Sequence, residues 1–291
     1  MTTLLPEREG SAATPIVLQH REYTRTRFAD RPIADGVTVT ELSLGGVPAL
    51  EFRPATTRLT ILYFHGGGFR AGSPRGLASY LSAMAALASV TVVAVAYRLA
   101  PEHPYPAGLN DGLAAFSFLR TADPSAVIVV AGDSGGGGIA TSLLMVLRAQ
   151  GETMPAGAFL LSPWADARMT AASYEDCADD DTVNSRPLAQ EAIDMYLQGW
   201  DPADPQLSTV LADWTGLPPV LIQASSHEVL RDDARSLAAA ALAGGVRVWY
   251  SEFPGVRHVW QNDYPLTPES VVAIEQVRDF LHSGIGLPTP S

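Results

Sequence analysis

The sequence has one cysteine, Cys177, among 291 residues. A single cysteine excludes a disulfide within the chain and leaves no cysteine cluster for a structural metal site. This cysteine usage is typical of proteins of the reducing cytoplasm. Cys177 itself is interpreted as a small, unreactive side chain in a loop.

Long apolar runs are also missing. The chain begins MTTLLPEREG, without a basic start followed by an apolar stretch, so no secretory signal is expected. Its longest apolar runs, such as SVTVVAVAY at 89–97, are far shorter than the ~20 residues of a membrane-spanning helix. The sequence therefore predicts a soluble, cytoplasmic protein without a membrane span.

Positive charge is scarce: 31 acidic side chains against 19 basic ones give a formal net charge of -12. Such a chain repels phosphate backbones and anionic lipid surfaces, so nucleic acid is not expected as a partner. Hydrophobic residues make up 47% of the sequence, which is enough for a substantial core in one large α/β domain or two smaller ones.

Short apolar runs with strand-like composition recur along the chain, at 59–64, 90–97, 126–131, 156–162, 219–224 and 246–253. Their hydrophobicity is continuous, which indicates strands buried on both faces, as in a parallel sheet covered by helices. Helix-like segments lie between them, at 79–89, 108–120, 139–150 and 233–244. The alternation predicts an open, doubly wound α/β sheet, with a hairpin of 37–44 and 49–53 at its edge. No linker or repeat divides residues 1–291, so a single domain is expected.

Two regions interrupt this alternation. Residues 1 to about 35 look polar and irregular, and residues 165–216 separate two predicted strands. An insertion of this size at the loop side of an α/β sheet is commonly a lid or substrate-binding cap. The alternative is an acidic, solvated loop with one packing helix.

The segment AGDSGGGGIA at 131–140 lies where a buried strand meets a helix. Gly132, Ser134 and Gly136 have the spacing of a nucleophile elbow, a sharp turn that exposes the serine hydroxyl and needs glycines to avoid clashes. A phosphate cradle is the functional alternative, but no lysine follows the glycines and the spacing differs from the dinucleotide fingerprint. The structural alternative is a tight turn that packs a helix on the sheet.

Two further motifs complete this chemistry. YFHGGGF at 63–69 follows a buried strand, and its glycines allow N–H groups to stabilise an oxyanion. FPGVRHVWQ at 253–261 places His258 in the loop after the last long strand, where a general base can reach Ser134. Serine, then acid, then histidine is the order of triad members in α/β-hydrolases.

The stretch SSHEVLRDD at 225–233 must then supply the acid. The acid accepts a hydrogen bond from the histidine and stabilises the imidazolium, which a neutral His227 cannot do. Asp232 and Asp233 stand at the start of a predicted helix, where aspartate caps free N–H groups. Glu228 is closest to the strand end and is therefore the candidate acid.

These motifs resemble the hormone-sensitive-lipase-like esterases, bacterial branch, of the α/β-hydrolase superfamily. The resemblance covers about residues 59–281. It rests on HGGGF at 65–69, YRLAPEHPYPAGLND at 97–111, GDSGGGG at 132–138, GLPPVLIQ at 216–223 and PGVRHVW at 254–260. It implies an α/β-hydrolase fold, a mostly parallel sheet flanked by helices, with a small cap from the N-terminus and residues 165–216.

The resemblance also assigns roles to residues. It implies Ser134 as the nucleophile, His258 as the base, and an oxyanion hole built from the N–H groups of Gly67, Gly68 and Gly135. In such enzymes the segment 97–106 is structural, so Arg98 and Glu102 are expected to form a buried ion pair.

The chain departs from the family pattern at two positions. Gly135 replaces the usual alanine after the nucleophile. Glu228 stands where the family has the first aspartate of an Asp-x-Leu-x-Asp pattern, while the spacing to Leu230 and Asp232 is kept. A glutamate is chemically adequate as the acid, although its extra methylene needs a small backbone adjustment.

The sequence thus predicts a carboxylic ester hydrolase for short-to-medium acyl chains that forms a serine acyl-enzyme and needs no metal or cofactor. Lactone opening, removal of an N-acetyl group, and noncatalytic binding of a small molecule are the alternatives; a nucleotide-binding protein is a remote one. Substrate-binding candidates are Phe69, Tyr196, Trp200 and Trp260, for which core packing is the competing role. The resemblance also implies a homodimer through the last strand, 246–253.

Overall fold

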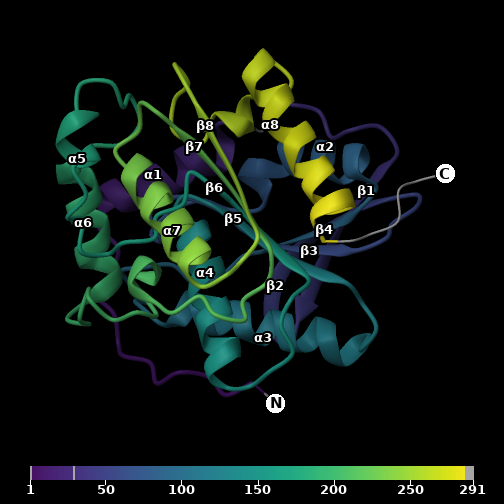
Figure 1. Ribbon diagram of the computed structural model, residues 1–291, viewed down its shortest axis with the longest axis horizontal. Helices are drawn as coiled ribbons and strands as arrows, with labels where there is room; N and C mark the ends of the chain where they lie inside the picture. Colours follow the sequence, from purple (N-terminus) through teal and green to yellow (C-terminus); the bar gives the residue numbers. More distant parts are fainter. Residues whose placement is uncertain (1, 29, 286–291) are drawn as a thin grey trace.

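One sheet of eight strands runs through the centre of the computed structural model, which describes residues 2–28 and 30–285 (Figure 1). The strands are β1 (Val37–Leu44), β2 (Val47–Pro54), β3 (Thr60–Phe64), β4 (Thr91–Val95), β5 (Ile128–Asp133), β6 (Gly157–Leu161), β7 (Val220–Ser225) and β8 (Val248–Phe253). Their order across the sheet is β1-β2-β4-β3-β5-β6-β7-β8. The predicted hairpin is confirmed, since β1 pairs antiparallel with β2, and β2 pairs antiparallel with β4. All remaining neighbours are parallel, as expected.

Helices cover both faces of this sheet (Figure 1). The main helices are α1 (Pro15–Thr26), α2 (Ala78–Ala88), α3 (Ala107–Ala122), α4 (Gly135–Ala149), α5 (Ser173–Asp176), α6 (Arg186–Leu197), α7 (Arg231–Ala243) and α8 (Pro268–Asp279). Buried side chains of α3, α4 and α7 join one apolar cluster, and those of α2 and α8 join the cluster on the opposite face. This two-sided cover explains the continuous apolar runs of the central strands β3, β4, β5 and β6.

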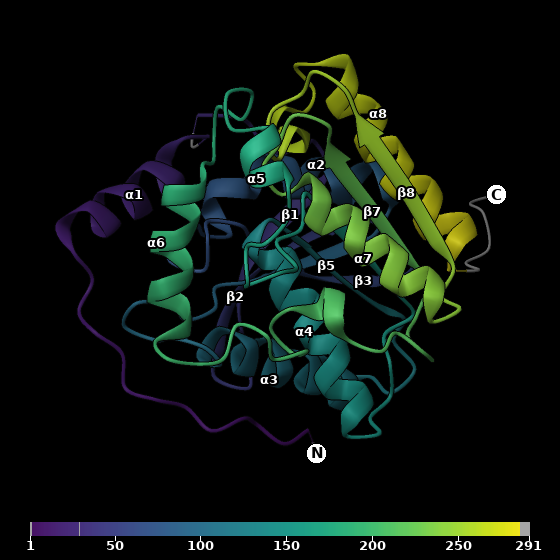
Figure 2. The same ribbon diagram turned by 60° about the vertical axis from the view of Figure 1, so that its left-hand side comes forward.

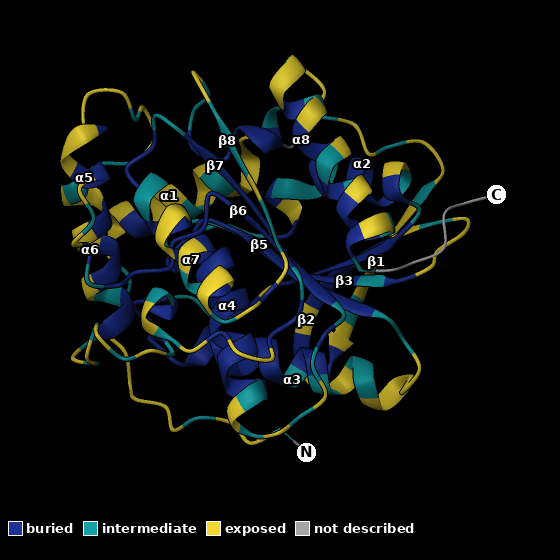
Figure 3. Ribbon diagram, viewed as in Figure 1, coloured by how far each residue is buried: buried dark blue, intermediate teal, exposed yellow. Residues whose placement is uncertain are grey.

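Strand β3 shows how each strand serves both layers. Leu62 and Phe64 belong to the cluster on the α3 and α4 face, whereas Ile61 and Tyr63 belong to the cluster on the α2 and α8 face. Successive side chains of a strand point to opposite faces, so the sequence supplies an apolar residue at each position. In Figure 3 the central strands are accordingly buried, while exposed residues lie on the outer sides of the helices.

The N-terminal region differs from the irregular segment that the sequence suggested. Residues 15–26 form helix α1, with Pro15 in its first turn. A proline there costs nothing, because that position has no intrahelical hydrogen bond to lose. Val17 is the only residue of α1 that is buried. With so little apolar surface to bury, the helix is not recognisable from hydrophobic periodicity.

Arg21 fixes α1 to the body of the protein. Its guanidinium donates to both carboxylate oxygens of Glu102 at 2.7 and 2.6 Å, to the carbonyl of Ala100 at 2.8 Å and to that of Arg70 at 2.8 Å. The bidentate geometry and the additional carbonyl acceptors distinguish this contact from an isolated surface ion pair.

This contact also corrects the expected pairing of Arg98 with Glu102. Arg98 instead forms ion pairs with Glu7 at 2.8 Å and Asp111 at 2.9 Å, and Glu102 pairs with Arg21. Arg98 and Glu102 thus each pair with a residue of the N-terminal segment, Glu7 and Arg21. The family motif at 97–111 does not include that segment.

The insertion at 165–216 contributes α5 and α6, and Figure 2 shows α6 beside α1 at one end of the sheet. Helix α6 buries Ala189, Ala192, Ile193, Tyr196 and Leu197 against the protein. The insertion is therefore packed on the body of the molecule, and Cys177 is buried with it. Among the helices of the described residues, none is long and apolar enough to cross a membrane.

Candidate active site

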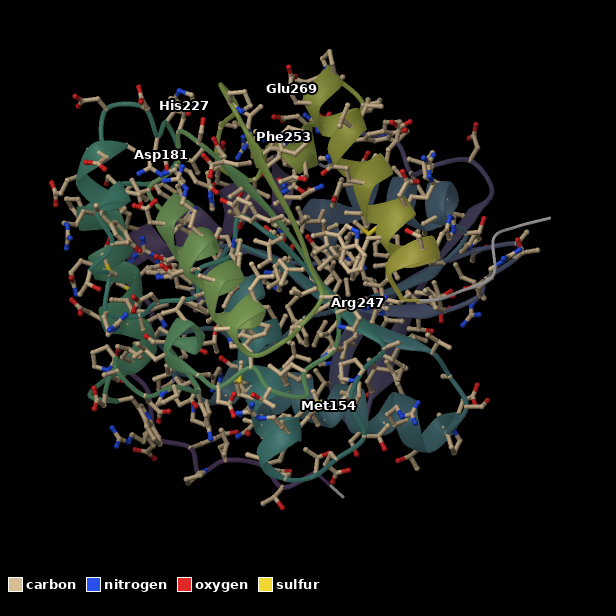
Figure 4. The ribbon with its side chains drawn as sticks, viewed as in Figure 1. Met154, Asp181, His227, Arg247, Phe253 and Glu269 are labelled. Atoms are coloured by element: carbon tan, nitrogen blue, oxygen red, sulfur yellow. The ribbon has the colours of Figure 1, made fainter. Side chains whose placement is uncertain are left out.

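The predicted site residues meet at the carboxyl ends of the parallel strands. Ser134 follows β5 directly, Glu228 comes three residues after β7, and His258 comes five residues after β8. Figure 4 labels Arg247 at the start of β8 and Phe253 at its end, and His227 lies near the Phe253 end. Open α/β sheets place their sites at this edge, because loops from several strands converge there.

Ser134 occupies a strained turn between β5 and α4. Its backbone has φ 53° and ψ -123°, a conformation that costs a non-glycine residue on the order of 1–3 kcal/mol. The Ser134 N–H donates to the Leu161 carbonyl at 2.9 Å, and its own carbonyl accepts from Gly137 and Trp164, each at 3.0 Å. These bonds to the neighbouring strand and loop hold the turn.

Glycines surround the serine because the backbones approach closely. A Cβ on Gly132 would collide with the carbonyl of Gly136, and one on Gly136 would collide with the carbonyl of Phe64 at the end of β3. The spacing that predicted a nucleophile elbow thus reflects helix α4 lying directly against the ends of β5 and β3.

Hydrogen bonds join the serine, the histidine and the glutamate in one line. His258 Nε2 lies 2.9 Å from Ser134 Oγ, and His258 Nδ1 lies 2.6 Å from Glu228 Oε2. An ionised carboxylate only accepts, so Nδ1 carries the proton and Nε2 is free to accept from the serine hydroxyl. This tautomer is the one that a general base needs.

The second carboxylate oxygen of Glu228 is also fixed by a hydrogen bond, which keeps the side chain oriented toward His258. Its side chain is fully buried, and Oε1 accepts from the Ser225 N–H at 3.0 Å. Burial lowers the pKa of the His258 imidazole, but the hydrogen bond to Glu228 and the charge of that carboxylate outweigh burial and leave the pKa raised. The imidazolium that forms when His258 takes a proton is thereby stabilised.

The other candidates in the same stretch have structural positions. Asp232 accepts from the Ser173 N–H at the start of α5 and pairs with Arg231, and His227 Nδ1 contacts Gly255 N–H and Ser226 Oγ. Asp233 accepts from two N–H groups of the loop at 165–166. The expected capping of α7 by the two aspartates is wrong, since the cap position is Leu230 and no side chain caps it.

Two segments bring glycine N–H groups to the region of Ser134: Gly67 and Gly68 line the same cavity as the serine, and Gly135 follows it directly in the chain. Gly67 and Gly68 have φ 121° and 59°, which suits glycine and turns the loop after β3 toward the cavity that Ser134 also lines. The N–H groups of Gly67, Gly68 and Gly135 have no hydrogen-bond acceptor among the described residues. Free donors next to a serine hydroxyl can stabilise an oxyanion.

Asp133, which precedes the serine, supports the loop after β3. Its carboxylate accepts from the Tyr63 hydroxyl at 2.9 Å and from the Gly66 N–H. Burial raises the pKa of Asp133 to about 6, although both hydrogen bonds act to lower it.

We expect Asp133→Asn to change how stability depends on pH. The folded pKa of about 6 exceeds the value of about 3.9 in an unfolded chain, so the stability linked to this group is fully present below about pH 3.9 and is lost as the pH rises through about 6. Between about pH 4 and pH 7 the free energy of unfolding should therefore fall by about 2–3 kcal/mol more in the wild type than in the variant. Urea titrations at both pH values measure this, with the exposed Asp180→Asn as control. A constant difference between wild type and Asp133→Asn would contradict it.

A cavity of about 760 Å³ opens above the serine, a size suited to a small organic ligand. Its walls come from α1, from the glycine loop at 65–68, from α6 and from the segment after His258. The cap that the sequence suggested therefore borders the cavity on two sides, through α1 and α6.

The four aromatic side chains proposed for substrate binding do not line this cavity. Phe69 stacks on Tyr196 with ring centroids 3.9 Å apart, and both are buried in the core. Trp260 packs against Phe253, and Trp200 lies under the guanidinium of Arg8. Packing is thus their observed role, because each finds an aromatic or cationic neighbour away from the cavity.

The residues that do line the cavity include several that the sequence did not suggest. Leu188, Ala189 and Ala192 come from α6, and Trp164 comes from the loop just before the 165–216 insertion. Helix α1 adds His20 and Tyr23, and its C-cap residue Arg27 also lines the cavity. The spacing of three and four residues along α1 is a usable signal only once the helix is known.

In the part of the chain that the structure describes, no three His, Cys, Asp or Glu side chains gather as a possible metal site.

Comparison with known proteins agrees with this geometry. The family described as the alpha/beta hydrolase fold matches residues 61–262, and the chain belongs to that family, as the sequence motifs predicted. It is 39% identical over 257 residues to an acetyl-hydrolase of Streptomyces hygroscopicus, covering 88% of this chain and 84% of that protein. It is 34% identical to a carboxylesterase of Mycobacterium tuberculosis, covering 85% and 79%. The crystal structure of an esterase from the bacterial hormone-sensitive lipase family matches with a TM-score of 0.89 and 36% identity, covering 95% of this chain and 94% of that one.

Proposed function

We propose that the protein is a carboxylic ester hydrolase that works through an acyl-enzyme on Ser134. The observation that carries this proposal is the continuous hydrogen-bonded line from Ser134 through His258 to Glu228, buried beneath the cavity. The similarity to proteins named carboxylesterase and esterase supports the same reaction class.

The geometry supports a two-step mechanism. In the first step His258 Nε2 takes the proton of Ser134 as Oγ attacks the acyl carbon, and Glu228 stabilises the imidazolium. The negative oxygen of the tetrahedral intermediate is stabilised by the N–H groups of Gly67, Gly68 and Gly135. His258 then gives the proton to the leaving alcohol, and water repeats the sequence to release the acid.

The acyl group is proposed to be short to medium. An acetyl group has a specific observation in its favour, which is the 39% identity to a protein named acetyl-hydrolase. The same residues could release acetate from an ester or from an N-acetyl amide, because the nucleophile and the oxyanion site are identical for both reactions.

Labelling with diethyl p-nitrophenyl phosphate, combined with turnover of p-nitrophenyl acetate, butyrate and octanoate, tests the function. We expect one phosphoryl group per chain on the peptide that contains Ser134, with loss of hydrolysis in proportion to labelling. Acetate or butyrate should be preferred to octanoate. Hydrolysis that survives complete labelling would contradict a serine mechanism, and absence of both labelling and turnover would favour a noncatalytic binder.

Location and assembly belong to the same proposal. A cytoplasmic site of action is supported by the use of a single cysteine. A homodimer through β8 is supported by the position of this strand at the edge of the sheet, where its free backbone groups can pair with a second copy.

A further inference from the structure

One wall of the cavity is a stripe of α1. Ile16, His20, Tyr23 and Arg27 all line the cavity, and their spacing of three or four residues puts them on the same side of the helix. From Ile16 to Arg27 the stripe extends roughly 16 Å at 1.5 Å per residue. The stripe is apolar at its N-terminal end, Ile16, and cationic at its C-terminal end, where Arg27 is the C-cap residue of the helix.

Two of the arginines that line the cavity, Arg70 and Arg257, are paired with acidic side chains, and a third is not. Arg70 pairs with Glu191 at 3.0 Å, and Arg257 forms a bidentate pair with Asp263 at 2.9 and 2.7 Å. Asp133 is buried and bound by a tyrosine hydroxyl and a backbone N–H.

Arg27 is this third arginine. Within residues 2–28 and 30–285 its guanidinium has no hydrogen bond or ion pair, and its contacts are with the rings of Phe28 and Tyr23, at 4.8 and 5.8 Å. Arg27 is exposed at the cavity wall. Partial burial of its guanidinium lowers the pKa of Arg27, and the charge of Arg257 lowers it further. Arg27 is therefore an accessible cation of the cavity wall that is not paired with an acid of the described residues.

The local charge balance is positive although the chain as a whole is strongly acidic. Arg31 and Arg257 share one carboxylate, that of Asp263, at 3.8 and 2.7 Å. With Arg27 added, three guanidinium groups stand around a single acid.

Asn262 provides a second observation at the same end of the cavity. Its side chain is 8% exposed and lines the cavity, and its Oδ1 is buried without a hydrogen-bond partner. No hydrogen bond of its amide nitrogen occurs within the described residues either. The buried Oδ1 is an acceptor and takes no part in binding an anion, whereas the amide nitrogen is a donor without a partner and is free to bind an oxygen atom of a ligand.

The position along the chain shows which part of the substrate this end receives. Arg257, Val259 and Asn262 flank His258 and line the cavity with it. Because His258 delivers its proton to the leaving group, we assign these chain neighbours of His258 to the leaving-group side of the scissile bond.

We propose that Arg27 and Asn262 form a subsite for a carboxylate carried by the leaving-group part of the substrate. This inference rests on the proposed ester hydrolase function and specifies its substrate class. Arg27 supplies the opposite charge, the Asn262 amide donates a hydrogen bond, and the Arg257 and Arg31 charges add attraction. The preferred esters are then those whose released alcohol is itself an acid.

A matched pair of acetyl esters tests the subsite. In 4-acetoxybenzoate the leaving phenol carries a carboxylate, and in methyl 4-acetoxybenzoate the same position is neutral. We expect the ratio of kcat/KM for the anionic ester to that for the neutral ester to fall roughly tenfold in Arg27→Gln, mainly through KM. The ratio in the wild type should also fall as sodium chloride is added. Arg25→Gln is the control, because Arg25 is an exposed residue of the same helix that pairs with Glu22 and does not line the cavity.

Equal ratios in the wild type and Arg27→Gln would overturn the subsite, as would an equal fall in Arg25→Gln. Binding of 4-acetoxybenzoate to Ser134→Ala by calorimetry separates this proposal from the proposed function. If neither ester is hydrolysed by the wild type but the ligand binds Ser134→Ala and is weakened by Arg27→Gln, the ester hydrolase function fails and the subsite stands. If hydrolysis occurs but Arg27→Gln does not weaken this binding, the subsite fails and the function stands.

Discussion

Glu228→Gln is expected to lower kcat for p-nitrophenyl butyrate by about ten-thousandfold, the effect of removing the triad carboxylate charge in serine hydrolases. The amide has no orientation that fits. With its oxygen toward His258 Nδ1, its NH₂ group faces the Ser225 N–H, which now donates to Glu228 Oε1. With its NH₂ group toward Nδ1, His258 is held in the tautomer that cannot accept the proton of Ser134.

Asp232→Asn is the matched control, because Asp232 lies in the same stretch and is paired with Arg231 outside the triad. Retention of more than about a tenth of the wild-type kcat by Glu228→Gln would place the acid elsewhere. The pH profile gives a second readout. The charge of Glu228 helps to raise the pKa of His258, and the base must be neutral to act, so residual activity of the variant should persist to lower pH than wild-type activity.

Gly136→Ala is expected to destabilise the fold by more than about 3 kcal/mol and to abolish activity, because the added Cβ would collide with backbone atoms. Its nearest neighbour would be the carbonyl oxygen of Phe64, at the end of a central strand. Neither helix α4 nor β3 can move without disturbing Ser134 or the glycine loop. Thermal and urea unfolding measure the loss.

Gly135→Ala is the control at the adjacent position. There a Cβ would lie 3.1 Å from the Phe69 N atom and 3.3 Å from its ring, and the N–H group is retained. We expect a change of less than about 1 kcal/mol, with alanine favoured over glycine in a helix. Equal destabilisation by the two substitutions would show that the stability loss in Gly136→Ala does not come from the close approach of α4 to β3.

Much of the architecture could be predicted because it is encoded in local patterns. The continuous apolar runs reflect strands covered on both faces. Closeness to the end of a predicted strand, together with alignment to the family's Asp-x-Leu-x-Asp pattern, identified Glu228, which the structure places 2.6 Å from His258 Nδ1. These signals are short in sequence and carry a direct physical requirement.

The cavity walls could not be predicted in the same way. Helix α1 buries one residue of its own and is attached through Arg21, whose main partner lies 81 residues away. An aromatic residue in the sequence can belong to a cavity wall or to the core, and the sequence does not distinguish the two. Phe69 and Tyr196 belong to the core, where their rings stack on each other. The pairing of Arg98 was missed for the same reason, since Glu7 lies 91 residues from it in the sequence.

The distances along the chain between contacting residues also determine when the enzyme becomes competent during synthesis. Ser134 and His258 are 124 positions apart, and Arg31 meets the Asn262 carbonyl across 231 positions. Translation proceeds at about 5–20 residues per second, so the residue that is synthesised first in such a contact waits on the order of 10–50 seconds for its partner. Helix α1 therefore leaves the ribosome before the loop that carries His258 and can complete the cavity only after that loop has been translated, so ester hydrolysis should appear during synthesis only after the residues up to Asn262 have emerged.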